Sequence, residues 1–269
     1  MVEFKKYKIG DRRFGLINWV GAYSLYKKEV FRFLIVSGQT LIGPIITSVL
    51  FLLVISLAIG NSKQDVLGVP FILFLAPGLI AMQVIQQSFA HSSSSLIMSK
   101  MMGTIQDTIG SPLSSAEVTL SIILASVTRG FLISIISSVI FYFFLDLEIN
   151  SYLIFFIYLF LGCFILGSLG FIAGLIANKF DEMATITNFL IVPLSFLSGT
   201  FYSIKRLPDI LQTVGYYNPF FHMIDGFRYS YINEMDGSLK FGIIYLTILS
   251  IISWLIAYYL FKKGYNIKS

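Results

Sequence analysis

The sequence predicts an all-α integral membrane protein with six transmembrane helices, an N-terminal interfacial helix and short re-entrant outer helices before the last span. Three observations lead to this prediction. Hydrophobic residues make up 56% of the 269 positions, charged residues only 12%, and the mean hydropathy is +0.82, whereas a soluble domain carries about 25% charged residues. Six segments are apolar over a length that crosses a hydrocarbon core about 30 Å thick. These segments lack the period-two alternation of transmembrane β-strands.

Composition and charge exclude several other classes of protein. The 43 aromatic side chains (2 Trp, 15 Tyr and 26 Phe) exclude a disordered chain. The single cysteine, Cys163, excludes a disulfide scaffold. The net charge of +5 does not predict nucleic-acid binding, because the excess of basic residues lies beside the apolar segments.

The transmembrane domain is predicted to cover residues 34–261, between an N-terminal segment 1–33 and a tail 262–269. Its six predicted spans are 34–59, 70–90, 118–145, 152–177, 186–204 and 241–261. The second span is the least apolar, since Pro77 and three glutamines lower its hydropathy. Membrane helices tolerate proline when neighbouring helices satisfy the freed carbonyls.

The basic residues predict the orientation of the chain. Thirteen of the 19 lie in the two terminal segments and in the loops after the second and fourth spans, against five in the other loops. Cytoplasmic loops carry the excess of Lys and Arg, so we expect both termini in the cytoplasm. The first residues include no early apolar core or cleavage site, and we expect no removable signal peptide.

The segment before the first span is predicted to form an amphipathic helix in the cytoplasmic interface. Its apolar residues recur at spacings of three and four, at Leu16, Trp19 or Val20, Tyr23, Tyr26, Val30 and Phe33. Ser24, Lys28, Glu29 and Arg32 fall on the other side. Helices with this pattern lie flat at the membrane surface. The alternative interpretation is a plain membrane anchor.

Residues 91–116 are predicted to form a structured cytoplasmic loop. Serines at 92 to 95 are expected to loosen the chain, and Ser111-Pro112 to end a short helix in which Met101, Ile105 and Ile109 share one side. A helix of this composition suits docking to a protein partner. The alternative is an ordinary polar connection, although 26 residues exceed what two neighbouring spans need.

The outer segment 205–240 is too long for a simple turn. Pro208 and Asn218-Pro219 divide it into at least two short pieces, with Asp225 and Arg228 among many aromatic residues. We expect short re-entrant helices here, and the alternative is an aromatic belt that anchors the adjacent spans.

Arg129 lies inside the third predicted span. An intramembrane arginine is a functional-site candidate by default, but without a paired acid it makes a poor ion relay. We favour a structural hydrogen-bonding centre that joins the second and third spans. The expected partners are Gln83, Gln86 and Gln87. In the fourth span, Gly170-x-x-x-Gly174 permits close helix packing.

Several chemistries are missing from the sequence. There is no Gly-x-x-x-x-Gly-Lys-Ser/Thr phosphate loop, and His91 and His222 fall at opposite sides of the predicted membrane, so no metal cluster, cofactor site or catalytic residue is predicted. No pair of intramembrane acids suggests a proton relay. The chain is therefore expected not to be an enzyme, and its energy is expected to come from a separate ATPase subunit.

Motifs spread over nearly the whole chain resemble those of one transporter family. They are the helix from Trp19 to Phe33, Pro77-Gly78-Leu79, Met102–Pro112, Arg129-Gly130, Phe180-Asp181-Glu182, Pro193-Leu194-x-Phe196-Leu197, Leu207-Pro208, Asn218-Pro219 and Gly226-Phe227-Arg228-Tyr229. In this order and spacing, the chain resembles the type-2 ABC-transporter permeases, the family of polysaccharide, drug and nodulation-factor exporters and the YadH-like inner-membrane permeases.

The resemblance implies a homodimer in a bacterial inner membrane, bound to two cytoplasmic ATP-binding subunits that hold ATP and Mg²⁺. The residues that it implies for coupling to the ATPase are Met102, Ile105, Gln106, Asp107 and Ile109, with Glu29 on the interfacial helix and Asp181 as a weaker contact. For the re-entrant outer helices it implies Pro208, Asn218, Pro219 and Arg228.

We therefore hypothesise a permease subunit of an ATP-driven exporter. Two alternatives stay open at this point, an ATP-independent secondary transporter or channel and a membrane scaffold protein. The partners expected are an ATP-binding subunit, a second copy of the chain and membrane lipids, without nucleic acid. The transported substrate does not follow from the sequence.

Overall fold

The computed structural model describes residues 17–59 and 65–266, which are almost entirely helical. The elements in chain order are α1 (Trp19–Ile35), η1 (Gly38–Ile42), α2 (Gly43–Ile59), β1 (Asp65–Val66), β2 (Val69–Pro70), α3 (Phe71–Met101), α4 (Ile105–Gly110), α5 (Ser115–Leu145), α6 (Tyr152–Ile176), α7 (Phe180–Ile186), η2 (Thr187–Ile191), α8 (Val192–Phe196), η3 (Ile204–Arg206), α9 (Asp209–Tyr217), α10 (Pro219–Ile232) and α11 (Leu239–Lys262). Of these, η1 and η2 are π-helical. The strands β1 and β2 have two residues each and pair antiparallel as a hairpin.

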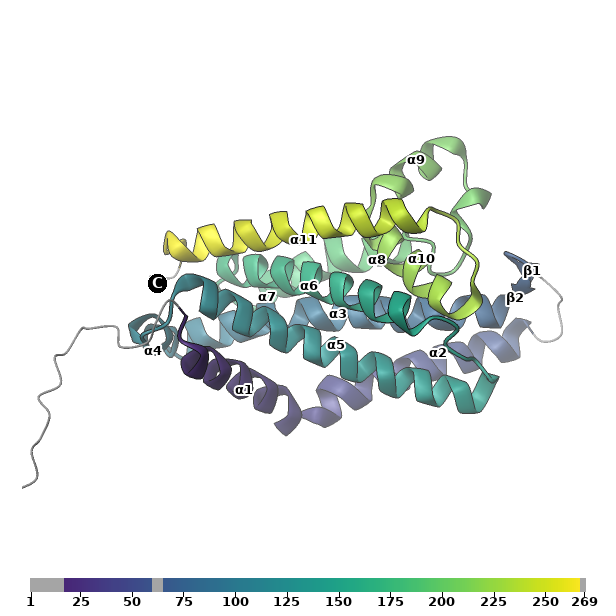
Figure 1. Cartoon of the computed structure of the whole chain (residues 1–269). Coiled ribbons are helices and arrows are strands. Elements are labelled where there is room, and N and C mark those ends of the chain that lie inside the picture. Colours follow the sequence, from purple (N-terminus) through teal and green to yellow (C-terminus); the bar gives the residue numbers. More distant parts are fainter. Residues whose placement is uncertain (1–16, 60–64, 267–269) are drawn as a thin grey trace, which may run out of the picture.

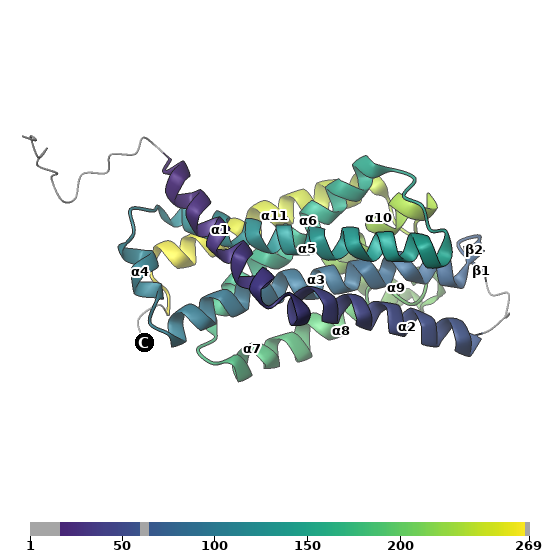
Figure 2. The same ribbon diagram turned by 90° about the horizontal axis from the view of Figure 1, so that it is seen from below.

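The long helices form one elongated bundle with α3, α5 and α6 at its centre (Figure 1). Between 61% and 67% of the most apolar window of each central helix is buried, against 28% for the first span and 22% for α11. The first span and α11 therefore present long apolar faces to the outside of the bundle. In Figures 1 and 2, α4 and the end of α11 lie at one end of the bundle, with β1, β2 and α9 toward the other. We call these the α4 end and the α9 end.

Five helices are long and apolar enough to cross a membrane. They are Gly38–Ala58, Phe71–Met101, Ser115–Leu145, Tyr152–Ile176 and Leu239–Lys262. They correspond to five of the six predicted spans, and they confirm a largely helical membrane protein.

The fifth predicted span, 186–204, is not confirmed. The helical residues run instead from Phe180 to Phe196 through α7, η2 and α8, and the chain turns at Gly199, whose φ is +70°. These 17 residues rise about 26 Å, less than the roughly 30 Å hydrocarbon core. Apolarity continues through the turn after α8, which is why composition alone extended the span to residue 204.

The connection between the second and third spans differs from the predicted loop 91–116. Helix α3 continues to Met101, and Ser92, Ser93 and Ser95 are buried within it. The Ser93 hydroxyl donates to the carbonyl of Phe89, one turn earlier, at 2.9 Å. The Ser95 hydroxyl donates instead to the Glu29 carboxylate on α1, at 2.8 Å. These serines do not loosen the chain, because the hydroxyls of Ser93 and Ser95 find acceptors in α3 and α1 and the small side chains permit close packing.

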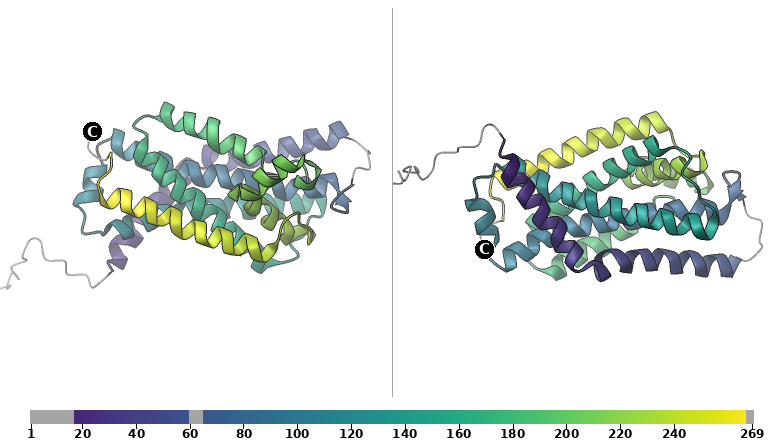
Figure 3. Two further views of the ribbon diagram at one scale, coloured as in Figure 1. Left: turned by 90° about the horizontal axis from the view of Figure 1, so that it is seen from above. Right: turned by 60° about the horizontal axis from the view of Figure 1, so that its bottom comes forward.

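The interfacial helix is confirmed as a helix, α1, which crosses the bundle at an angle before α2 (Figure 3). Its buried side is formed by Leu25, Glu29 and Phe33, while Trp19 and Tyr23 are exposed. The predicted apolar stripe is thus divided between the bundle and the surroundings, and the helix is partly embedded in protein.

The outer segment 205–240 contains the short helices α9 and α10, as its prolines predict. Pro208 immediately precedes α9, and Pro219 is the first residue of α10, the position where its missing N–H costs nothing. The depth of these helices in a membrane stays a prediction.

Candidate functional site

The short helix α4 presents an exposed surface at one end of the bundle. Gly103, with a φ of +72°, allows the sharp turn between α3 and α4. Ile105 is buried at 3% exposure and anchors the helix, whereas Gln106, Asp107 and Ile109 are exposed. Met102 is exposed beside them. The predicted coupling residues in and beside α4 are therefore exposed, except Ile105, which holds the helix in place.

Other segments meet at the α4 end. The Lys100 ammonium at the end of α3 donates to the carbonyl of Leu175 at 2.9 Å, which joins the end of α3 to the end of α6. Asp181 is exposed at the start of α7. A cavity of about 260 Å³ lies between α4 and the end of α11, lined by Gln106, Ile109, Phe261 and other residues.

Glu29 does not belong to this exposed surface. Its side chain is buried on α1, accepts a hydrogen bond from Ser95 at 2.8 Å and pairs with Arg32 at 2.9 Å. Arg32 also donates to the carbonyl of His91 at 3.1 Å. The sequence prediction of Glu29 as a contact to the ATPase therefore needs correction, since its carboxylate faces α3.

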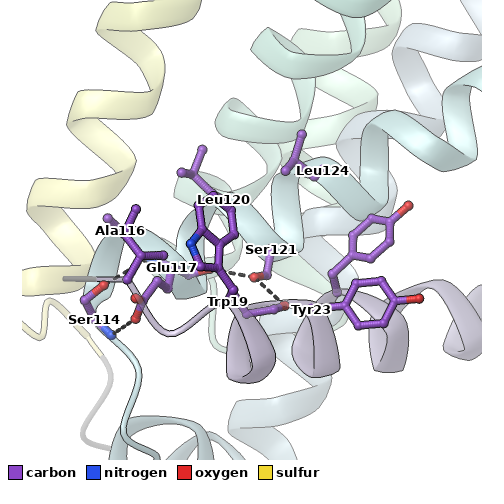
Figure 4. Close-up of a pocket in the computed structure, with 11 residues that line it drawn as sticks. Trp19, Tyr23, Ser114, Ala116, Glu117, Leu120, Ser121 and Leu124 are labelled. Atoms are coloured by element: carbon purple, nitrogen blue, oxygen red, sulfur yellow. Dashed lines mark hydrogen bonds between the residues drawn. The ribbon is translucent and has the colours of Figure 1, made fainter. Parts of the chain in front are cut away.

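A second set of bonds joins α1 to the start of α5. Ser114 and Glu117 form a capping box at the first turn of α5, and the Glu117 carboxylate also accepts from the N–H of Asn18 at 2.6 Å. Figure 4 shows Trp19 and Tyr23 on α1 facing Leu120 and Leu124 on α5 across a cavity of about 450 Å³.

This connection is not predicted from the sequence, although Ser-x-x-Glu before an apolar run is a recognisable helix start. The motif predicts where α5 begins, and it does not reveal that the same carboxylate holds the N-terminus of α1.

Arg129 is a buried hydrogen-bonding centre between three spans. It donates to the side chain of Gln87 and to the carbonyl of Thr40 at 3.1 Å. Pro44 lies four residues after Thr40 and has no N–H to offer that carbonyl, so Arg129 supplies the missing donor. Of the three predicted glutamine partners, Gln87 is hydrogen-bonded to Arg129, while Gln83 and Gln86 are half-buried elsewhere on α3.

Arg228 is fully buried near the α9 end. It donates to the carbonyls of Phe74 at 3.1 Å and Gly199 at 2.7 Å, and its guanidinium lies 3.8 Å from the centre of the Phe74 ring. Asp225, one turn earlier, pairs with it at 3.8 Å and accepts the N–H of Gly237 at 2.8 Å. Burial raises the pKa of the Asp225 carboxyl, and Arg228 opposes this shift.

Asn218 fixes the junction between α9 and α10. Its side-chain oxygen accepts the N–H of Phe220 at 3.0 Å, and its amide donates to the hydroxyl of Ser198 at 2.8 Å. Arg228 thus holds the outer segment to α3. Asn218 and Arg228 together hold it to the residues that follow α8.

The family of this protein follows from its similarity to known proteins. A family model described as ABC-2 type transporter matches residues 22–232. The chain belongs to the ABC-2 type transporter family. The match contains every residue named above as a predicted site and ends at the last residue of α10, before α11.

Relatives of this ABC-2 permease support the assignment over almost its full length. Inner membrane transport permease YadH of Escherichia coli strain K12 is 30% identical over 255 residues, which cover 94% of this chain and 99% of the relative. Nodulation protein J of Neorhizobium galegae is 22% identical, over 80% of this chain and 81% of the relative. The protein is therefore a membrane transport subunit, and family membership implies association with ABC ATP-binding subunits.

Proposed function

We propose that this ABC-2 permease is the membrane subunit of an ATP-driven exporter in a bacterial inner membrane, working as a homodimer with two ATP-binding subunits at the α4 end. The observation that carries the proposal is the exposed surface of α4. This helix joins the two central helices α3 and α5 directly, and Ile105 anchors it. A force applied to α4 therefore reaches both central helices.

The distribution of charge supports a cytoplasmic position for the α4 end. Six of the eight described lysines lie on α1, at the end of α3, beside α7 and at the end of α11. They are Lys27, Lys28, Lys100, Lys179, Lys262 and Lys263, whereas Lys205 and Lys240 lie at the α9 end. Basic residues are retained on the cytoplasmic side, and this side is where ATP is available.

The energy source is a partner because the sequence lacks a phosphate loop. ATP and Mg²⁺ belong to that partner. Export as the direction of transport rests on analogy with the family that the sequence resembles.

The exposed faces of the outer helices support a homodimer. On α11 the exposed side chains in the apolar region are apolar, apart from Thr247, whose hydroxyl donates to the carbonyl of Ile243. The face formed by the first span and by η2 also exposes the amides of Gln39 and Asn188. A polar amide facing lipid is unfavourable, and polar side chains in membranes bond across helices. We place the second copy against this face and lipid against α11.

Substitution of Asp107 tests the coupling surface. We expect Asp107→Trp to lower ATP hydrolysis by the co-purified complex in lipid nanodiscs severalfold, because a bulky ring on α4 separates it from the ATP-binding subunit. Membrane insertion and thermal stability should not change, since Asp107 is exposed.

The matched control is Asp209→Trp, an exposed acid in the first turn of the short helix α9 at the opposite end. It should leave hydrolysis at the wild-type rate. Equal hydrolysis by the two variants would show that α4 does not receive the ATP-binding subunit.

A further inference from the structure

Helix α1 is tied to the last turns of α3 by buried polar contacts. Glu29 accepts from Ser95 at 2.8 Å, and Arg32 donates to the carbonyl of His91 at 3.1 Å. Ser95 lies less than two turns before Met101, where α3 ends and the chain turns into α4. Hydrogen bonds to buried charged groups are stronger than neutral ones, so these contacts resist separation of α1 from the α4 end of α3.

The same helix is tied to the first turns of α5, on the other side of α4. The N–H of Asn18 donates to Glu117 at 2.6 Å, and the Ser121 hydroxyl donates to the carbonyl of Ala22 at 2.9 Å. Helix α1 thus bridges the two segments that flank α4.

The connection between α1 and α2 is built differently. At this connection, which we call the elbow (Val36–Ile42), the chain is π-helical from Gly38 onward, and Val36 is exposed. A β-carbon added at Gly38 would meet nothing within 4 Å. Within the elbow, Arg129 holds the carbonyl of Thr40, and Leu41 is buried. The exposed first part of the elbow, Val36–Gln39, is therefore loosely packed between α1 and this fixed point, and π-helical turns are frequent at functional sites.

We infer that Glu29 and Arg32 are positioning residues that make α1 move together with α4, with the elbow as the hinge. This inference rests on the proposed function, in which α4 receives the force. It also replaces the role predicted for Glu29, because the carboxylate acts within the permease and does not touch the ATP-binding subunit.

The first part of the test uses the permease alone in lipid nanodiscs. Spin labels at Ser24→Cys on α1 and Met102→Cys, both exposed, report the distance between α1 and the turn before α4 by pulsed electron paramagnetic resonance, with the buried Cys163 replaced by alanine. We expect a narrow distance distribution in the parent, and a broad one shifted to longer distances in Glu29→Ala.

Three further variants control this measurement. Glu29→Gln keeps an oxygen that accepts from Ser95 and should restore the narrow distribution in part. Glu29→Leu keeps a similar volume without an acceptor and should not restore it, which separates the hydrogen bond from packing. Lys28→Ala removes an exposed charge from the same helix and should match the parent. A Glu29→Ala distribution equal to that of Lys28→Ala would overturn the inference.

The second part adds the co-purified ATP-binding subunit and ATP. Labels at positions 102 and 152 report movement of the α4 end relative to the start of α6, where Tyr152 is exposed. Because Met102 lies on the surface proposed to receive the ATP-binding subunit, the distances are measured on labelled complexes that hydrolyse ATP at the rate of the unlabelled complex. We expect ATP to change the 102–152 distance and to leave the 24–102 distance unchanged. In Glu29→Ala the 24–102 distance should change as well.

The two proposals fail in different ways. If ATP changes the 24–102 and 102–152 distances in the parent equally, α1 does not move with α4 and the inference is wrong. If ATP changes neither distance, the proposed ATP coupling fails. The contacts of Glu29 then hold together two helices that do not move, and the inference that α1 moves with α4 is wrong as well.

Discussion

Replacement of Gly170 with alanine is expected to destabilise the folded bundle by about 3 kcal/mol, near the upper end for an overpacked core. A β-carbon at this position would lie 2.3 Å from the carbonyl oxygen of Phe89 on α3. That obstacle is backbone of a central helix, so no side-chain rotation relieves it. Gly174, one turn later, meets the carbonyl of Ser93 at 2.8 Å in the same way. Reversible unfolding in mild detergent measures the loss.

Gly162→Ala provides the control on the same helix. Its β-carbon would meet only the side chain of Met223, at 3.6 Å or more, which is ordinary contact. We expect this variant to be as stable as the parent. If Gly170→Ala is no less stable than Gly162→Ala, then α3 and α6 do not approach as closely as described.

Removal of Arg228 is expected to cost a similar amount, about 3–5 kcal/mol, because it leaves the buried carboxylate of Asp225 without its partner. Arg228→Met keeps much of the apolar volume and loses the bonds to Phe74 and Gly199. Arg228→Lys should restore little of the stability, since a single ammonium cannot donate in both directions while stacked on the Phe74 ring. Unfolding in detergent again gives the change.

An exposed arginine at the same end is the control for Arg228. Among the residues that the structure describes, the Arg206 guanidinium donates to the carbonyl of Asp65, at 3.0 Å, and the side chain is exposed. Arg206→Met should change stability by less than about 0.5 kcal/mol. Comparable losses for the two arginines would mean that Arg228 does not carry the joint between α10, α3 and the turn at Gly199.

Five helical spans could be predicted from apolar length. The exception among the six predicted spans, 186–204, has a physical cause. Residues 186–204 are apolar enough for a span, but hydropathy does not register backbone direction. The chain leaves the helix after Phe196 and reverses at Gly199. A proline with a nearby glycine is compatible with either a kinked helix or its end, and tertiary contacts decide between them.

The hydrogen-bond partners of the buried polar residues Arg129 and Glu29 could be predicted only in part. Arg129 could be predicted to seek Gln87, because a buried guanidinium needs acceptors and the two spans are neighbours. The carbonyl of Thr40, the other acceptor of Arg129, is not among the predicted partners, although Pro44 has no N–H to donate to it. The spacing predicts that Glu29 lies on the polar side of α1, but spacing alone does not distinguish a polar side that faces water from one that faces buried serine and histidine.

Photo-cross-linking from position 106 on α4 in native membranes, followed by identification of the captured protein, shows directly whether an ATP-binding subunit meets α4. We expect capture of an ATP-binding subunit with a phosphate loop from position 106, and no such capture from position 213 on α9, where Thr213 is exposed at the other end. Capture of that subunit from position 213 and not from position 106 would show that α4 is not the coupling surface. Transport that continues in vesicles from which the ATP-binding subunit has been removed would show that this subunit is not the energy source.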